Sequence, residues 1–235
     1  MNMIDQVRAP VASHEAGRYF HHVRREIAPL LPQSCSRILD IGAGAGHTLK
    51  WLKTIYPDAV TTGVEINTAV AEELRENADL VFIGDAEDAL ARIEPCDLIL
   101  LLDVLEHLVD PVRTLRKVTG VLSPGGRVIV SVPNVAHLSV SLPLLLRRRF
   151  TYRDAGILDR THLRFFVEDT AVQLLNDASL VVRKGLLSGM QGRRYKLIDL
   201  MSFGLLRHYL TQQYIMLGQS GPCVVQPTIR WDSAP

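Results

Sequence analysis

The sequence predicts an α/β fold in which a doubly wound, mostly parallel sheet carries helices on both faces. Short apolar runs alternate along the chain with helical patterns. Several of the runs are apolar at nearly every position, as in strands that are covered on both faces. A glycine-rich segment, ILDIGAGAGH (38–47), stands between the first run and the first helical pattern. Ligands of open α/β sheets bind at such strand ends.

Strands are expected where the apolar runs lie. They are RILDI (37–41), VTTGVEI (60–66), LVFI (80–83), DLILLL (97–102) and RVIVSV (127–132). Helical stripes lie between them, and Pro111 suits the first turn of the helix before the fifth strand. SPGG (123–126) predicts a turn into that strand. An amphipathic helix over 12–31 is expected before the sheet, and its apolar side holds Tyr19, Phe20, Val23, Ile27 and Leu30.

The regular alternation breaks after residue 132. Residues 133–167 contain prolines, an arginine triplet and no clear period, and we expect a lid over the ligand edge of the sheet at 135–167. A helix is expected near 168–178, and LVVRKGLL (180–187) and QQYIMLG (212–218) are expected as the last strands. Residues 1–219 then form one domain, and 220–235 a loosely ordered tail.

Composition argues against a nucleic-acid-binding or membrane-inserted protein. The chain has 235 residues, 47% of them hydrophobic, and a net charge of +1. This balance gives no global reason to expect nucleic acid or an anionic membrane as a partner. Three cysteines lie far apart with no CxxC pair, which favours reduced thiols in a cytoplasmic protein. We expect no stable membrane insertion, because no apolar run reaches the ~18 residues of a spanning helix.

The glycine loop does not have the spacing of a dinucleotide site. Such sites use G-x-G-x-x-G, whereas the third glycine position here holds His47. Asp40, two positions before Gly42, would repel a pyrophosphate and attract a positively charged group. A short-chain dehydrogenase would also need a Tyr-x-x-x-Lys pair, and none of the six tyrosines has a lysine four residues later.

Acids also end the next three strands: Glu65, Asp85 and Asp103. Glu65 stands where a carboxylate accepts both hydroxyls of a ribose. Asp85 can accept from an adenine amino group while Ala86 offers a backbone N–H. Together with the glycine loop, these acids predict a pocket for S-adenosylmethionine, whose ammonium group suits Asp40 or Asp103.

The motifs ILDIGAGAG, GVEIN, GDAED, DLILLLDVLEHLVDP and VLSPGGRVIVSVPN occur in this order. In them the chain resembles class I S-adenosylmethionine-dependent methyltransferases over residues 36–134. The nearest subgroups are ubiquinone-type O-methyltransferases, MetW-like proteins and glycan-modifying methyltransferases, and GILDRTHLRFF (156–166) also occurs among them. The resemblance implies a Rossmann-like sheet of seven strands whose last strand, here 212–218, is antiparallel.

The resemblance also implies roles by position: the methionine end for the glycine loop, the ribose for Glu65, the adenine for Asp85, and the sulfonium side for Asp103. Small side chains at Ala43 and Ala45, where relatives often carry other residues, should leave the loop intact. The predicted cofactor-binding residues are Asp40, Gly42, Ala43, Gly44, Glu65, Ile66, Asp85, Ala86, Asp103 and Val104.

Two histidines are the predicted catalytic residues. A hydroxyl nucleophile must lose a proton, and histidine is the usual base near neutral pH. His107 follows the fourth strand, and His162 lies in the predicted lid, where Phe165 and Phe166 can anchor it. The alternative is that Asp103, Glu106, His107 and His162 bind a divalent metal ion, as in the similar E-x-x-E-H arrangement of some RNA 2'-O-methyltransferases and ubiquinone-type enzymes.

The acceptor remains open at this point. Arginines of the lid, at positions 147, 148, 149, 153 and 160, suit an anionic acceptor or form a solvated face. LPLLLRRRF (142–150) is also compatible with contact to a membrane surface. We expect methyl transfer to a hydroxyl of a small molecule or glycan precursor. The alternatives are a non-catalytic cofactor-binding regulatory partner, as among MetW-like proteins, and, third, an RNA methyltransferase.

Overall fold

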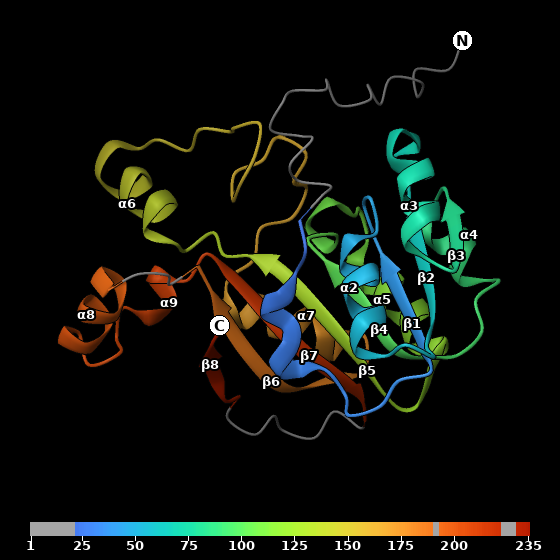
Figure 1. Ribbon diagram of the computed structural model, residues 1–235. Coiled ribbons are helices and arrows are strands. Elements are labelled where there is room, and N and C mark those ends of the chain that lie inside the picture. Colours follow the sequence, from blue (N-terminus) through green and yellow to red (C-terminus); the bar gives the residue numbers. More distant parts are fainter. Residues whose placement is uncertain (1–21, 190–192, 222–228) are drawn as a thin grey trace, which may run out of the picture.

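A computed structural model describes residues 22–189, 193–221 and 229–235 (Figure 1). Within these residues the strands form one sheet of eight, in the order β3-β2-β1-β4-β5-β7-β6-β8. The strands are β1 (Arg37–Ile41), β2 (Val60–Glu65), β3 (Leu80–Ile83), β4 (Cys96–Leu102), β5 (Leu122–Pro133), β6 (Leu180–Ser188), β7 (Gln213–Ser220) and β8 (Trp231–Ser233). The doubly wound α/β fold predicted from the sequence is confirmed.

Helices cover both faces of the sheet. The α-helices are α2 (His47–Ile55), α3 (Ala71–Asn77), α4 (Ala86–Leu90), α5 (Pro111–Gly120), α6 (Leu138–Arg147), α7 (Glu168–Asp177), α8 (Arg193–Met201) and α9 (Arg207–Leu210). The part of the chain that the structure describes also contains three short 3-10 helices, η1 (Arg25–Leu30), η2 (Thr68–Val70) and η3 (Leu105–His107). No helix among the described residues is long and apolar enough to cross a membrane.

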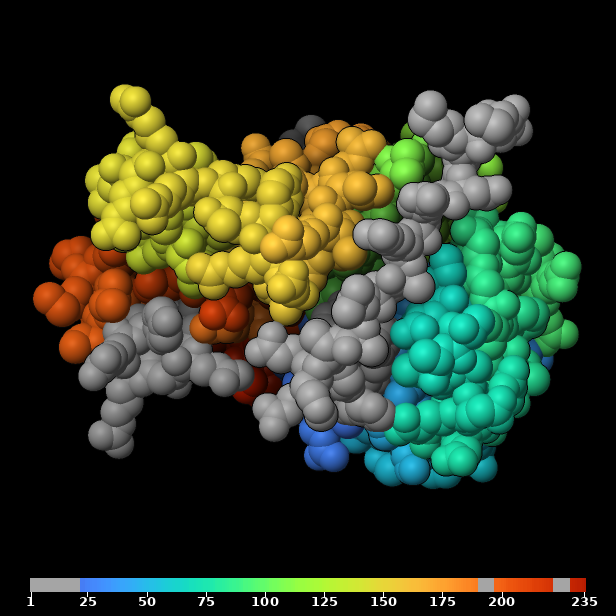
Figure 2. All heavy atoms as spheres, turned by 90° about the horizontal axis from the view of Figure 1, so that it is seen from above, coloured from blue at the N-terminus to red at the C-terminus, as the bar shows by residue number. Residues whose placement is uncertain are grey.

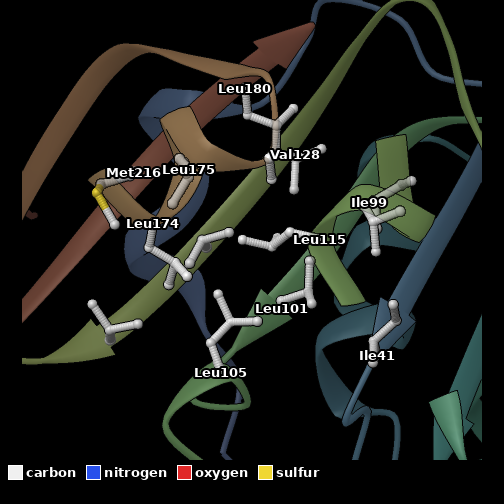
Figure 3. Packing of buried hydrophobic residues seen from close by; sticks show 14 of the residues in the cluster. Ile41, Ile99, Leu101, Leu105, Leu115, Val128, Leu174, Leu175, Leu180 and Met216 are labelled. Carbon is white, nitrogen blue, oxygen red and sulfur yellow. The ribbon is translucent and has the colours of Figure 1, made fainter. Parts of the chain in front are cut away.

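Alternation along the strands sends side chains into two cores. Leu98 and Leu100 of β4 face a core with η1, α2 and α3. Ile99 and Leu101 face the opposite core, where they pack with α5 and α7 (Figure 3). Both faces of β4 are therefore covered by other side chains and shielded from solvent, which explains why its sequence is apolar at nearly every position.

The last strands differ in part from the prediction. As expected, β7 is antiparallel, between β5 and β6. The count of seven strands is wrong, because β8 lies within the predicted loose tail and pairs parallel with β6. Gly185 of β6 makes this possible, since a Cβ there would overlap the ring of Trp231.

The segment before the sheet is also corrected. Of the helix predicted over 12–31, the described part contains only the 3-10 helix η1, and Tyr19 and Phe20 lie outside the described residues. Pro29 stands inside this short helix, where its ring and missing N–H oppose a regular α-helix. Ile27 and Leu30 are nevertheless buried, as their spacing predicted.

Two other corrections concern β5 and the lid. SPGG (123–126) lies within the bounds of β5 but does not pair with β4, because the register passes from Leu122 opposite Cys96 directly to Arg127 opposite Leu98. Gly125 has a φ of 77°, so the predicted turn is an irregularity inside the strand and not a turn before it. The region 135–167 contains an unexpected helix, α6, whose N-terminus is capped by His137 through a hydrogen bond from the Ser139 N–H (3.2 Å). The helix escaped prediction because Pro143 stands inside it and because it buries only Val140, so it has no apolar stripe facing the core.

Candidate active site

The three glycines of the loop between β1 and α2 have different tasks, and all have positive φ angles. A Cβ on Gly42 would lie 2.5 Å from Cγ2 of Val104, so this glycine lets the segment after β4 pack over the loop. A Cβ on Gly46 would lie 2.7 Å from Cδ1 of Leu74 in α3. Gly44 instead donates its N–H to Oε2 of Glu65 (2.8 Å). Two of the glycines thus serve packing, and one serves the carboxylate network.

Glu65 fastens the loop to the end of β2. Its carboxylate is buried, and it also accepts from the N–H of Asn67 at 2.8 Å. Each carboxylate oxygen has a second lone pair. Glu65 is therefore held in one orientation and still has acceptor capacity for hydroxyl groups, which fits the predicted ribose site.

Asp40 is 3% exposed and forms no side-chain hydrogen bond within the described part of the chain. Burial, and second the charge of Glu65, raise the pKa of Asp40 to about 7, while the Arg24 charge acts in the opposite direction. A cation placed beside this carboxyl would favour its ionised form. Asp40 therefore fits the ammonium group for which the sequence proposed it.

The predicted adenine side is more open. Asp85 is exposed and caps α4, its Oδ1 accepting from the N–H of Glu87 at 2.7 Å. Ala86 is the first residue of α4, and Ile66, directly after β2, is 74% exposed. The cap gives Asp85 a structural task in addition to its predicted one, and contact of these residues with adenine stays a prediction.

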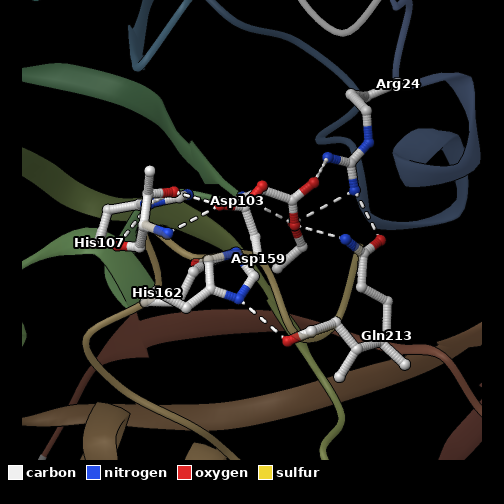
Figure 4. A network of polar contacts seen from close by, with 10 residues as sticks. Arg24, Asp103, His107, Asp159, His162 and Gln213 are labelled. Atoms are coloured by element: carbon white, nitrogen blue, oxygen red, sulfur yellow. Dashed lines mark hydrogen bonds and ion pairs between the residues drawn. The ribbon is translucent and has the colours of Figure 1, made fainter. Parts of the chain in front are cut away.

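Asp103, with a φ of 59°, is the centre of a polar network after β4 (Figure 4). Its Oδ2 accepts from Nη1 of Arg24 at 2.6 Å, and its Oδ1 accepts from Ser131 Oγ at 2.9 Å and from Gln213 Nε2. Sequence reasoning missed Arg24, Ser131 and Gln213. No local pattern marks them, because Arg24 and Gln213 lie 79 and 110 positions from Asp103.

The structure brings the two predicted histidines together, with ring centroids 4.8 Å apart in an edge-to-face arrangement. The main-chain oxygen of Glu106 accepts from the N–H of Leu163 (2.8 Å), which draws the lid onto η3. Nδ1 of His107 contacts Oγ1 of Thr161 at 3.1 Å, and Nδ1 of His162 contacts the oxygen of Ile157 at 3.1 Å. Each ring is therefore oriented by the lid.

Only one of the two expected anchors reaches the core. Phe166 is buried in the larger core, as predicted. Phe165 instead packs against Phe150, with centroids 5.5 Å apart, so its prediction as a core anchor is wrong. Adjacent residues of this extended segment point to opposite sides, and Phe165 therefore faces the lid.

Glu106 is the most unusual group at the site. It is 1% exposed, and its Oε2 has no hydrogen-bond partner among the described residues. Burial, followed by the charge of Asp103, raises the pKa of Glu106 well above its ordinary range. Oε1 lies 4.0 Å from Nε2 of His162. A buried orphan oxygen of this kind requires a proton, a substrate group or a cation.

The arrangement also fits a divalent cation. Ligand atoms of Glu106, His107 and His162 lie within 4.8 Å of one another. One carboxylate and two imidazoles suit a first-row metal ion. The fourth predicted ligand, Asp103, is instead engaged by Arg24, and the described geometry groups three of the four residues.

Comparison with known proteins gives the family. Residues 13–184 match the family described as "Methyltransferase domain". The chain belongs to this methyltransferase family. The resemblance to class I S-adenosylmethionine-dependent methyltransferases is thereby confirmed, and the cofactor of that class is the one predicted from the acids at the strand ends.

Its curated relatives include several O-methyltransferases. The chain is 31% identical over 151 residues to a "Ubiquinone biosynthesis O-methyltransferase" of Azorhizobium caulinodans, a match that covers 62% of this chain and 58% of the relative. A protein of the same name from Alkalilimnicola ehrlichii is 29% identical over 74% of this chain and 72% of its own length. A "Trans-aconitate 2-methyltransferase" of Methylobacterium radiotolerans is 29% identical over 46% of this chain and 43% of its own length. The chain thus spans about half the length of several relatives it matches.

Solved structures share the fold. A methyltransferase from Archaeoglobus fulgidus has a TM-score of 0.61 at 18% identity and covers 88% of this chain and 94% of its own. An O-methyltransferase from a polyketide synthase of Brevibacillus brevis, solved with S-adenosyl-L-homocysteine, has a TM-score of 0.58 at 15% identity and covers 86% of this chain and 72% of its own. At these identities the likeness concerns the fold alone.

Proposed function

We propose that this methyltransferase transfers the methyl group of S-adenosylmethionine to a hydroxyl group of a small-molecule or glycan-precursor acceptor. The observation that carries the proposal is the pairing of His107, directly after β4, with His162 of the lid, beside Asp103. When bound, the cofactor supplies an electrophilic methyl group on a sulfonium.

The first role of the protein's residues in this reaction is to bind the cofactor. Asp40 takes the ammonium, Glu65 the ribose hydroxyls, and Asp85 with the N–H of Ala86 the adenine. Arg24 is a cation in the same network as Asp103 and is suited to the methionine carboxylate. Holding the acceptor and the methyl group in line can lower the activation barrier by ~7–11 kcal/mol. A binding site that fixes both in this geometry therefore accelerates methyl transfer by itself.

The second part is proton removal. Burial lowers the pKa of His162, with the charge of His107 as the next cause, so this ring is neutral near pH 7. A neutral imidazole accepts the proton of the acceptor hydroxyl during methyl transfer. His107, held by Thr161, positions the acceptor or shares that proton.

The names of the relatives support a hydroxyl acceptor, since several are O-methyltransferases. The name of the trans-aconitate relative is the reason to include carboxylic acids among the acceptors tested. A location in the cytoplasm stays a prediction from the sequence, as do the residue roles above.

The experiment is a methyl-transfer screen with isotopically labelled cofactor across phenols, sugars, nucleotide-sugars and carboxylic acids. We expect transfer to at least one hydroxyl compound. Binding of S-adenosyl-L-homocysteine should weaken at least about tenfold in Glu65→Ala, because charge-assisted hydrogen bonds of ~1.5–3 kcal/mol are lost. Cofactor binding without transfer to any acceptor would favour the non-catalytic regulatory partner.

A metal-assisted version of the reaction is the second candidate, favoured by the orphan oxygen of Glu106. A metal ion would lower the pKa of the acceptor hydroxyl. Chelation should then abolish turnover, and Glu106→Gln should be as harmful as His107→Ala. Full activity in chelator leaves the histidine base as the mechanism.

A further inference from the structure

Two helical segments at one end of the molecule expose large apolar side chains to solvent. They are α6 and the stretch from α8 to α9. We define the α6–α8 face by Leu142, Leu145, Leu146, Leu200, Met201 and Phe203, whose exposed fractions lie between 47% and 94%. Soluble surfaces carry single exposed apolar residues routinely, but a gathering of this kind marks an interaction site.

The apolar residues have helical order. Leu142, Leu145 and Leu146 follow the i, i+3, i+4 spacing that places side chains on one side of α6. Leu197, Leu200 and Met201 repeat this spacing in α8. Each helix therefore presents an apolar side outward, where no described element covers it.

The two segments lie at the same end of the molecule and are connected by hydrogen bonds at their bases. The side-chain amide of Asn134, four residues before α6, donates to the oxygens of His208 (2.7 Å) and Thr211 (2.8 Å) at α9. Asn134 N–H also donates to the oxygen of Gln212 at 2.8 Å. Figures 1 and 2 show α6 and α8 at the same end of the molecule.

A cluster of positive charge borders this face. Arg147, Arg148, Arg149 and Arg153 are exposed, and none forms an ion pair or a side-chain hydrogen bond among the described residues. The nearby acids are already paired, Asp154 with Arg160 at 2.7 Å and Asp199 with Arg207 at 2.9 Å. The four guanidinium groups therefore give the border a net positive charge.

We propose that the α6–α8 face binds the surface of an anionic lipid bilayer. Apolar side chains beside several arginines are what a headgroup region with negative lipids accommodates. A helix of ten residues is about 15 Å long, so α6 suits a position in the plane of the interface. Phe203 is 94% exposed, the largest exposed fraction in this face, and offers an aromatic side chain for insertion into the bilayer surface.

Charge argues against a second copy of this chain as the occupant. A symmetric contact through this face would bring the same arginine clusters toward each other without acids to pair with them. An anionic bilayer satisfies both the apolar side chains and the arginines at once. The inference stands on the surface alone and is independent of the proposed methyl acceptor.

The test is co-sedimentation of the full chain with vesicles of phosphatidylcholine alone or of phosphatidylcholine with phosphatidylserine. We expect binding to the phosphatidylserine vesicles that weakens with salt. Arg147→Glu with Arg149→Glu, and separately Leu145→Asp with Phe203→Asp, should each lower partitioning at least about tenfold. Circular dichroism melting checks that the variants fold.

Matched controls lie elsewhere on the surface. Arg92→Glu with Lys50→Glu changes the same number of charges, and Val109→Asp removes an apolar side chain that is 75% exposed. These variants should bind vesicles like the wild type. Equal loss in the controls, or no binding by the wild type, would overturn the proposal. A dimer in light scattering that Leu145→Asp disperses, without vesicle binding, would assign the face to a second copy.

Discussion

Asp40 should make cofactor binding depend on pH. Its carboxyl group is buried, makes no side-chain hydrogen bond within the described residues, and has a pKa of about 7. An ammonium group beside it would stabilise the ionised form and lower that pKa. We therefore predict that cofactor binding at pH 7 releases a fraction of a proton. Calorimetry in two buffers with different ionisation enthalpies should give different binding enthalpies.

Asp40→Asn is the matched control, since it keeps the shape and removes the titration; its binding enthalpy should not depend on the buffer. Equal wild-type enthalpies in both buffers would separate Asp40 from the ammonium. In the free protein the folded pKa is raised above the ordinary 3.8. Asp40 therefore contributes stability below about pH 4 that is lost as pH rises through 7, and Asp40→Asn should flatten this decline.

His162 should set the acid limb of the reaction. A base acts in its neutral form, and the pKa of His162 is lowered by burial below its usual 6.5. We predict that kcat/KM is constant near neutrality and falls only below pH 6.5. His162→Ala should lower turnover ~10²–10⁴-fold with little change in cofactor affinity.

The exposed His22 provides the control variant. His22→Ala should leave both turnover and cofactor affinity unchanged. A pH profile that keeps its acid limb in His162→Ala would show that another group titrates. If both His162→Ala and His107→Ala retained turnover, alignment alone would be the mechanism.

At the scale of elements, the glycine loop joins β1 to two neighbours, the segment after β4 and helix α3. Gly46 combines a φ of 81° with contact to Leu74, so a side chain there meets both backbone strain and overlap. We predict that Gly46→Ala lowers the free energy of unfolding by ~2–4 kcal/mol, from strain plus overpacking. Urea unfolding followed by circular dichroism measures it.

Gly125 separates the two causes. Its φ is 77°, close to that of Gly46, but a Cβ there would meet nothing within 4 Å. Gly125→Ala should therefore cost only the backbone penalty of ~1–2 kcal/mol. Equal losses in both variants would mean that contact with α3 contributes nothing.

At the scale of the whole molecule, β8 brings the end of the chain back onto the sheet beside β6. Trp231 packs over Gly185 and against Tyr214, with ring centroids 5.2 Å apart, and its Nε1 donates to Oε1 of Glu168 at 2.7 Å. The ring thereby connects β6, β7 and the start of α7.

We predict that Trp231→Ala lowers the free energy of unfolding by ~1–3 kcal/mol, less than for a fully buried tryptophan because Trp231 is partly exposed. Trp231→Phe replaces the indole with a smaller aromatic ring and loses the hydrogen bond to Glu168, so it should cost less than Trp231→Ala, about 1 kcal/mol. Both follow from guanidinium unfolding curves. An unchanged midpoint in Trp231→Ala would show that β8 is not part of the cooperative unit.

Local chemistry made much of this fold predictable. Strands 37–41 and 80–83 were predicted to the residue, because each is a short run rich in apolar residues that ends at a glycine. Burial on both faces is not required for this, since β3 lies at the edge of the sheet and is partly exposed. The acids at the strand ends and the glycine spacing pointed to one cofactor class for a similar reason. A cationic, ribosylated ligand needs those groups at those chain positions, whatever the rest of the fold does.

Tertiary structure alone decided which distant groups meet. Arg24 and Gln213 reach Asp103 only because the segment before β1 and the start of β7 lie at the same sheet edge. β8 is a strand of three residues whose pairing depends on a glycine 46 positions earlier, Gly185 beside Trp231. Periodicity reports the environment of a residue along its own element, and it carries no record of the partner across space. The sequence could therefore nominate Glu106 and His162 as members of one candidate metal-binding set, while their 4.0 Å approach depended on how the lid packs over η3.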